Sequence, residues 1–155
     1  MTITAKDIMV TTFDKIHQDA SVDQVIQMIL NGKIRKSGHK TVSLIVVDDL
    51  GNLCGVITMF DLLFHLRPGF LNCGIDGHEL SWDGQLAKLI PELKEKKVHQ
   101  VMSRTTTCAS PDDHLMVVLD RMVKKRYRRL PVLDEGKLVG VVYISDIYYK
   151  LFDSY

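Results

Sequence analysis

An internal repeat limits what this chain can fold into more than any other feature of its sequence. Met9 matches Met102 at a shift of 93 residues, whereas Asp61 matches Asp146 at a shift of 85 residues. The shift falls mainly because the first copy carries extra residues around 31–40. Loops are where a scaffold accepts insertions, so the two copies predict one common unit. Further matched pairs are Thr12 with Thr105, Val25 with Val118, Leu44 with Leu130 and Gly55 with Gly140.

Each copy predicts the same order of elements: an amphipathic helix, a hairpin of two strands and a short closing helix. Ser21 and Gln24 fit a capping box at the start of the first helix. The apolar stripe of this helix follows the spacing i, i+3, i+4, i+7 and i+8. Its residues are Val22, Val25, Ile26, Ile29 and Leu30 in copy one, and Leu115, Val118, Leu119, Met122 and Val123 in copy two. The strands are expected at 43–48, 53–59, 130–134 and 138–144.

The stretch 67–97 separates the copies and is predicted to be a structured linker. Glycine and proline at its start interrupt regular structure, and a short helix is expected around Leu86. Because proline lacks the N–H group of a helix interior, Pro91 is expected to open a second helix over 92–97. Trp82 is interpreted as a packing anchor. The expected division is a first motif at 1–66, the linker at 67–97 and a second motif at 98–155.

Composition narrows the classes of function. Charged residues make up 25% of the chain and the formal net charge is +1, so no overall field favours nucleic acid or an acidic membrane. No apolar run reaches the roughly 18–20 residues that span a bilayer, and the N-terminus shows no secretory signal. A cytoplasmic protein that does not bind membranes is therefore expected. Three cysteines without a CxxC pair indicate neither a disulfide framework nor a zinc site.

Two short motifs give the repeat a family resemblance. Residues 55–61 fit the pattern Gly-x-x-Thr-x-x-Asp, and residues 130–134 fit the pattern Leu-Pro-Val-hydrophobic-Asp. Together they resemble the CBS-motif family. The resemblance implies an α/β (α+β) fold in which two βαββα motifs pack about a pseudo-twofold axis. It also implies two clefts between the motifs for adenosyl compounds, mostly AMP, ADP, ATP or S-adenosylmethionine, and a homodimer formed through the helices.

Two repeated carboxylates are the leading candidates for ligand contact. Asp61 and Asp146 are expected to begin the closing helices, where a carboxylate can accept hydrogen bonds from both hydroxyls of a ribose. Capping of the helix is the alternative role. Thr58 adds a hydroxyl near a helix N-terminus, which suits phosphate. Its counterpart Tyr143 departs from the motif, and Ser145 is expected to supply the missing oxygen. Unequal sites are therefore expected, and occupancy of one site or of both stays open.

Basic residues and first strands complete the expected clefts. The run 124–129 is of a kind that usually forms a solvated face. The family resemblance, however, places residues before the Leu-Pro-Val strand in the clefts, so Arg128 or Arg129 is expected to pair with phosphate. The resemblance also implies that first strands supply an adenine slot. Its residues are Val10, Thr11 and Phe13 for the Asp146 cleft, and Ser103, Thr107 and Cys108 for the Asp61 cleft.

Other functions find less support. The sequence has no P-loop, GxGxxG, HExxH or Gly-x-Ser-x-Gly pattern, so neither enzymatic activity nor a cofactor is expected. A metal site of His39, His65 or His78 with Cys73 lacks recurring spacing. Nucleic-acid binding through 124–129 lacks a wider basic face. The main alternative is a dimerisation or protein-interaction module with degenerate clefts, and a separate regulated protein is the expected partner.

Overall fold

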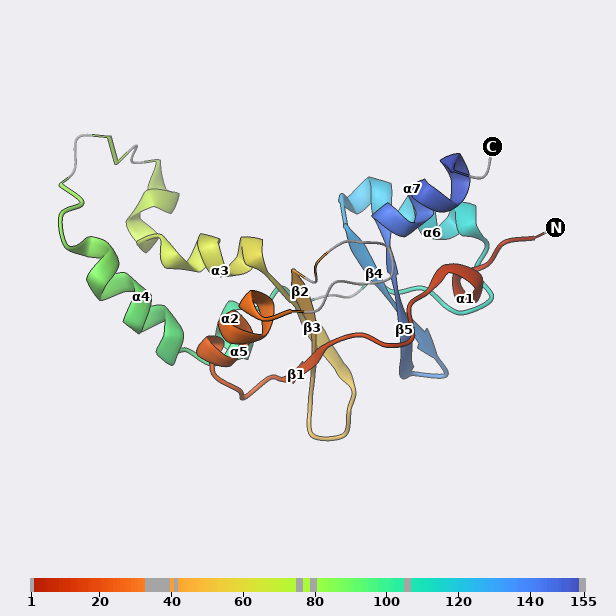
Figure 1. Cartoon of the computed structure of the whole chain (residues 1–155), viewed down its shortest axis with the longest axis horizontal. Helices are drawn as coiled ribbons and strands as arrows, with labels where there is room; N and C mark the ends of the chain where they lie inside the picture. Colours follow the sequence, from red (N-terminus) through yellow and green to blue (C-terminus); the bar gives the residue numbers. More distant parts are fainter. Residues whose placement is uncertain are drawn as a thin grey trace. The chain divides into compact units, whose positions relative to one another are not determined.

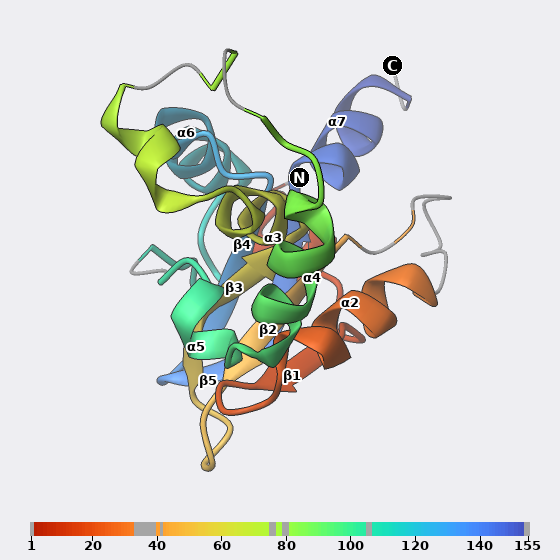
Figure 2. The same ribbon diagram turned by 90° about the vertical axis from the view of Figure 1, so that its left-hand side faces the viewer.

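The computed structural model describes residues 2–32, 40, 42–74, 77–78, 81–104 and 107–153 (Figures 1 and 2). The chain forms two compact units, which are described separately. Unit 1 comprises Met1–Asp14, Asp48–Leu53 and Thr105–Tyr155, and unit 2 comprises Lys15–Val47 and Cys54–Arg104. The units therefore do not follow the repeats along the chain. Unit 1 combines most of the second repeat with the leading segment of the first, residues 1–14, and unit 2 combines most of the first repeat with the leading segment of the second, residues 98–104.

The mixed helix and strand architecture expected from the sequence is confirmed. A sheet with the strand order β1-β2-β3 forms in the first repeat. Its first two strands run parallel, with Ile16 opposite Val46, and helix α2 connects them. The last two strands follow each other through a tight turn, in which the Asp48 carboxylate accepts from the backbone N–H groups of Leu50 and Asn52. The elements are β1 (Lys15–His17), α2 (Val22–Leu30), β2 (Ser43–Val47) and β3 (Leu53–Thr58).

Helices cover this sheet and bury Val22, Val25 and Ile29 of the apolar stripe predicted for the first repeat, whereas Leu30 at the end of the stripe is exposed. Ser21 caps α2 by accepting from the backbone N–H of Gln24, which is one half of the expected capping box. The core combines residues of α2, the strands and the later helices: Ile16, Val22, Val25, Ile29, Leu44, Val46, Ile57, Leu62, Leu93, Val98 and Val101. The later elements are α3 (Met59–Leu66), the 3₁₀ turn η1 (Gly69–Cys73), α4 (Gln85–Glu95) and α5 (Val98–Val101).

The linker contains one helix across Pro91, so the prediction that this proline separates two helices was wrong. Helix α4 runs from Gln85 to Glu95 with Pro91 inside it. Proline removes one backbone hydrogen bond, but Pro91 and Ala87, which lies four residues before it, are both exposed, so water can satisfy the freed carbonyl. Leu93 is buried beyond the proline, and α4 packs against α2 and α3 (Figure 2). Apolar burial beyond the proline therefore keeps the helix continuous.

Trp82 lies at the start of this linker helix and contacts the preceding turn. Its indole N–H donates to the carbonyl of Gly77 at 3.0 Å, and its ring stacks on Phe70 with the centroids 6.3 Å apart. The side chain is 40% exposed. Trp82 therefore joins local segments of the linker and is not a deeply buried anchor.

Unit 1 is built around the hairpin of the second repeat. Strands β4 and β5 are antiparallel, and Arg129 pairs with Tyr143 at the open end. The predicted apolar stripe of α6 is buried at Leu115, Val118 and Met122. The core also includes Ala5, Ala109, Leu130, Val132, Val142 and Ile147. The elements are α1 (Ala5–Ile8), α6 (Leu115–Lys125), β4 (Arg129–Asp134), β5 (Lys137–Tyr143) and α7 (Ile144–Phe152).

The leading segment of each repeat pairs with the hairpin of the other. In unit 1, Val10 and Val141 exchange two backbone hydrogen bonds of 2.8 and 3.0 Å. In unit 2, Ser103 and Val56 exchange two of 2.9 Å. The expected first strand over 10–13 is thus only a bridge at Val10, since the continuous strand β1 begins at Lys15. Among the residues that the structure describes, one pair of backbone hydrogen bonds joins each of these segments to the hairpin that it crosses.

Glycine is required where these segments cross the hairpins. A Cβ atom at Gly55 would lie 2.4 Å from the backbone oxygen of Ser103. At the equivalent Gly140 it would lie 2.6 Å from the Sδ atom of Met9. Real Cβ atoms do not approach so closely, so the leading segments pass where side chains are absent.

Replacing these glycines with alanine tests the crossings. We expect Gly55→Ala to lower the free energy of unfolding by about 1–3 kcal/mol, because a backbone atom must move. Gly140→Ala should cost less, since the end of the Met9 side chain can turn away. Gly69→Ala is the control, because nothing lies within 4 Å of its Cβ position, and it should change stability by less than about 0.5 kcal/mol. Chemical denaturation measures all three; equal effects at Gly55 and Gly69 would contradict the crossing geometry.

Candidate functional site

A buried carboxylate lies where β3 passes into α3. Thr58 is the N-cap of α3 and Asp61 is its third residue. The backbone N–H and the hydroxyl of Thr58 donate to Asp61 Oδ2 at 2.9 and 3.1 Å, and the Asp61 N–H donates back to the Thr58 hydroxyl at 3.1 Å. Asp61 is only 9% exposed. The capping role considered for Asp61 is therefore present, and the hydrogen bonds fix the orientation of its carboxylate.

A third predicted residue joins this pair from the leading segment of the second repeat. The hydroxyl of Ser103 donates to Asp61 Oδ1 at 2.7 Å, across 42 residues of sequence. Its backbone pairing with Val56 brings it to the end of β3. The structure thus brings together Thr58, Asp61 and Ser103, which the sequence assigned to one cleft. We call these three residues the Asp61 cluster; their role in binding stays a prediction.

The corresponding residues of the second repeat lie together in unit 1. Asp146 is the third residue of α7, as Asp61 is of α3. Tyr143 stands at the N-cap but forms no side-chain cap hydrogen bond. Ser145 and Asp146 are half-buried, and Val10 approaches through its bridge to Val141. The second repeat therefore reproduces the position of the carboxylate without the hydroxyl cap.

The predicted basic residues border this second site. The Arg128 carbonyl accepts from the Ile144 N–H at 2.9 Å, and Arg129 pairs with Tyr143 in the hairpin. Arg129 is half-buried, whereas Arg128 is exposed. Arg126, with φ of 56°, ends α6 in the left-handed region before this segment. Both arginines thus lie beside the N-terminus of α7, where their predicted phosphate contact stays to be tested.

The other predicted slot residues are divided between the units. Thr11 is exposed and Phe13 is half-buried in the leading segment of the first repeat, which belongs to unit 1. Thr107 and Cys108 also belong to unit 1, whereas Asp61 belongs to unit 2. The Cys108 carbonyl accepts from the Arg121 guanidinium at 3.0 Å. Burial raises the pKa of the Cys108 thiol, although the charge of Arg121 acts in the opposite direction. Their assignment to the Asp61 cleft stays a prediction.

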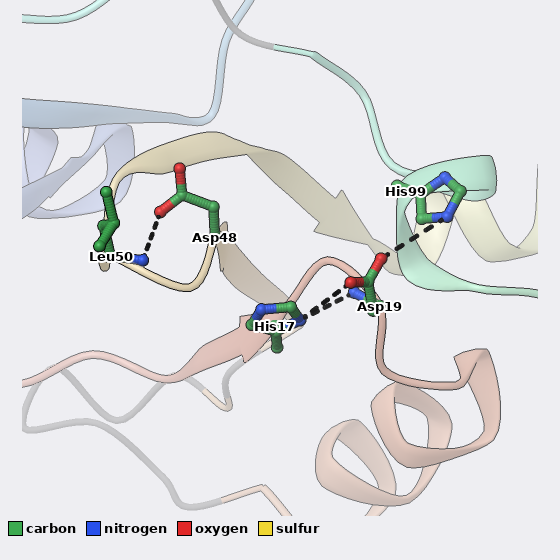
Figure 3. A network of polar contacts seen from close by, with 5 residues as sticks. All are labelled: His17, Asp19, Asp48, Leu50 and His99. Carbon is green, nitrogen blue, oxygen red and sulfur yellow. Dashed lines mark hydrogen bonds and ion pairs between the residues drawn. The ribbon is translucent and has the colours of Figure 1, made fainter.

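Sequence analysis did not identify the polar contacts around Asp19 (Figure 3). The Asp19 carboxylate lies 3.9 Å from His17 Nδ1 and 3.9 Å from His99 Nε2. His17 Nδ1 accepts from the Asp19 backbone N–H at 3.0 Å. The backbone N–H of His99 also donates to the backbone carbonyl of Gln18 at 2.9 Å. These contacts tie α5, and hence the approach to Ser103, to the end of β1.

Metal binding and membrane spanning find no support in the residues that the structure describes. Among them, no group of three or more His, Cys, Asp or Glu side chains is placed to hold a metal ion. His39, considered as a ligand, lies outside the described residues. None of the described helices is both long and apolar enough to cross a bilayer.

His65 lies one helical turn beyond Asp61 and gives a test of the site's electrostatics. Burial lowers the pKa of His65 below its usual 6.5, Lys96 lowers it further, and Asp61 partly opposes both. The unfolded chain therefore binds this proton more tightly, so the stability from neutral His65 is present above about pH 6.5 and lost as pH falls through the lowered pKa. When the pH falls from about 7.5 to about 5.5, the free energy of unfolding should decrease less for the His65→Gln variant than for the unmodified protein. Identical pH profiles in denaturant titrations would contradict this.

Known proteins resemble this chain in sequence and in fold. An uncharacterized protein of Methanocaldococcus jannaschii is 25% identical over 149 residues, covering 96% of this chain but only 42% of that protein. The crystal structure of CBSX2 in complex with AMP matches with a TM-score of 0.69 and 24% identity, covering 97% of each chain. A CBS domain pair in complex with methylthioadenosine and S-adenosyl-L-methionine matches with a TM-score of 0.66 and 22% identity, covering 99% of this chain and 98% of the other.

The family model for the CBS domain matches both repeats. It covers residues 5–68 and 98–153, and so leaves out most of the predicted linker. These ranges begin at α1 and at α5, and they end just after the two closing helices α3 and α7. The chain therefore belongs to the CBS domain family and carries two copies of its motif.

Proposed function

We propose that this chain is a regulatory sensor module that binds an adenosyl compound, with AMP or ATP as the leading ligands and ADP or S-adenosylmethionine as further ones. One observation carries the proposal: Asp61 and Asp146 stand at the third position of equivalent helices, each beyond a strand that pairs with a leading segment. A carboxylate held in this way accepts hydrogen bonds from ribose hydroxyls. The module has no catalytic role in this proposal.

Helix ends and arginines support binding of the phosphate. The N-termini of α3 and α7 carry the partial positive charge of the helix dipole, which favours anions. In unit 1, Arg128 or Arg129 pairs with the phosphate, since a guanidinium fork matches phosphate oxygens. At the other site, Thr58 is the N-cap of α3, and its hydroxyl lies at the helix N-terminus where we propose that the phosphate binds. Ligand charge is thereby balanced locally in a chain whose net charge is only +1.

The fold neighbours agree with this ligand class. CBSX2 was crystallised with AMP, and another CBS domain pair with methylthioadenosine and S-adenosyl-L-methionine. All three ligands contain adenosine or a close derivative, so the ribose and adenine are the shared chemistry. We propose the same class for this chain, with Val10, Thr11 and Phe13 supplying the adenine slot beside Asp146. Ligand binding then shifts the population of conformations that a regulated protein recognises.

A second candidate function is dimerisation or protein interaction without a ligand. Both carboxylate oxygens of Asp61 already accept hydrogen bonds from Thr58 and Ser103, which favours this alternative. Large apolar side chains are also exposed on the closing helices, namely Phe60 and Leu63 on α3 and Tyr148, Tyr149 and Phe152 on α7. A homodimer through these helices is compatible with either function. Ligand binding separates the two candidates.

Thermal unfolding with AMP, ADP, ATP and S-adenosylmethionine tests the sensor function. A ligand at about 100 times its dissociation constant should add about 2.7 kcal/mol to the unfolding free energy. We expect Asp61→Ala or Asp146→Ala to abolish binding at its own site, as measured by calorimetry on the folded variants. Asp112→Ala, at an exposed position outside both sites, is the matched control and should bind normally. If none of the four compounds stabilises the protein, the interaction module becomes the better account.

A further inference from the structure

We infer that the hydroxyl of Ser103 restricts Asp61 to one ribose hydroxyl, so that this site recognises a nucleoside through one of its two hydroxyls instead of through the vicinal pair. The inference rests on the proposed function, because it concerns how the Asp61 cluster reads the sugar. Ser103 is thereby a specificity-determining residue that acts through Asp61.

The hydrogen bonds of Asp61 leave little capacity for a ligand. A carboxylate offers about four acceptor positions, two on each oxygen. Both positions on Oδ2 are used by Thr58, whose N–H and hydroxyl lie at 2.9 and 3.1 Å. One position on Oδ1 is used by Ser103 at 2.7 Å. Among the residues that the structure describes, these are the donors to Asp61, so one position remains and it lies on Oδ1.

The bonds already present are costly to displace. The two from Thr58 belong to the reciprocal cap of α3, and breaking them would uncap the helix. The bond from Ser103 is short and charge-assisted, which makes it stronger than a hydrogen bond between neutral groups. Asp61 is largely buried, so an oxygen that lost its donor would pay most of its desolvation cost. A ribose hydroxyl is therefore better added to the remaining position than exchanged for Ser103.

The backbone holds Ser103 where it can act in this way. Its N–H and carbonyl both bond to Val56 at 2.9 Å, next to the point where Gly55 leaves no room for a side chain. The segment therefore cannot retreat without breaking the crossing itself. In the second repeat, the residue that pairs with Val141 in the same way is Val10, which has no hydroxyl. Val10 therefore cannot impose this restriction on Asp146.

Calorimetry with sugar-modified nucleotides tests the inference on the 155-residue chain carrying Asp146→Ala, which leaves the Asp61 site as the binding site. The ligands are AMP, 2′-deoxy-AMP and 3′-deoxy-AMP. We expect one deoxy compound to bind about tenfold or more weakly than AMP, since it lacks the hydroxyl that bonds the carboxylate. The other should bind within about twofold of AMP, because its missing hydroxyl has no acceptor on Asp61.

Replacing Ser103 should change this pattern. With Ser103→Ala, a second acceptor position opens, so both deoxy compounds should bind about tenfold or more weakly than AMP. AMP itself should bind more tightly than before. Ser103→Val, which copies the residue found at position 10, should behave like Ser103→Ala. Ser103→Thr keeps the hydroxyl and should retain dependence on a single hydroxyl. Thermal unfolding confirms that each variant is folded.

The outcomes separate the inference from the proposed function. If AMP binds but both deoxy compounds lose affinity equally before Ser103 is changed, the vicinal pair is read and the inference is wrong. Weaker AMP binding by Ser103→Ala would also overturn it, because Ser103 would then contact the ligand directly. If no AMP binds to the Asp146→Ala protein at all, the proposed ribose site at Asp61 fails, and the inference fails with it.

Discussion

The crossing of each leading segment over the hairpin of the other repeat is the constraint on which the structure depends. Two pairs of backbone hydrogen bonds, at Val10 with Val141 and at Ser103 with Val56, hold these crossings. They explain why each compact unit contains residues from both repeats. They also require Gly55 and Gly140, since a side chain there would meet the passing segment. A candidate site completed by both repeats follows directly from this exchange.

Stability and recognition share the same atoms at the end of β3. Thr58 and Asp61 satisfy the first N–H groups of α3 and at the same time orient the carboxylate that we assign to the ribose. A buried carboxylate without donors would be costly, so the ligand-free protein must supply its own hydrogen bonds. Ser103 supplies one of them. The site is therefore preorganised, but its remaining capacity for ligand hydroxyls is small.

Patterns that repeat locally made much of the fold predictable. Apolar periodicity predicted α2 and α6, and the turn residues predicted both hairpins, because the residues within each element are enough to determine its local structure. Contacts between distant segments were harder to predict. Helix α4 continues through Pro91 because Leu93 is buried beyond it, and the strand expected at Val10 shrank to a single bridge. The family resemblance assigned Thr58, Asp61 and Ser103 to one cleft, but the bond of 2.7 Å from Ser103 depends on the crossing.

Divergence between the two sites follows from what each repeat places around an equivalent carboxylate. The Thr58 hydroxyl is close enough to its own backbone to accept a hydrogen bond from the first turn of α3. The phenol oxygen of Tyr143 lies at the end of a long side chain and cannot form the equivalent hydrogen bond to the first turn of α7. Helix α7 accordingly begins without a side-chain cap. The residue that crosses the strand beside it is valine instead of serine, which removes a second hydroxyl from the carboxylate's surroundings. Both changes alter the groups around the second carboxylate, and Arg128 and Arg129 add positive charge nearby. The same scaffold therefore surrounds two equivalent carboxylates with different groups: the hydroxyls of Thr58 and Ser103 bond to Asp61, whereas two arginines lie near the start of the helix that carries Asp146.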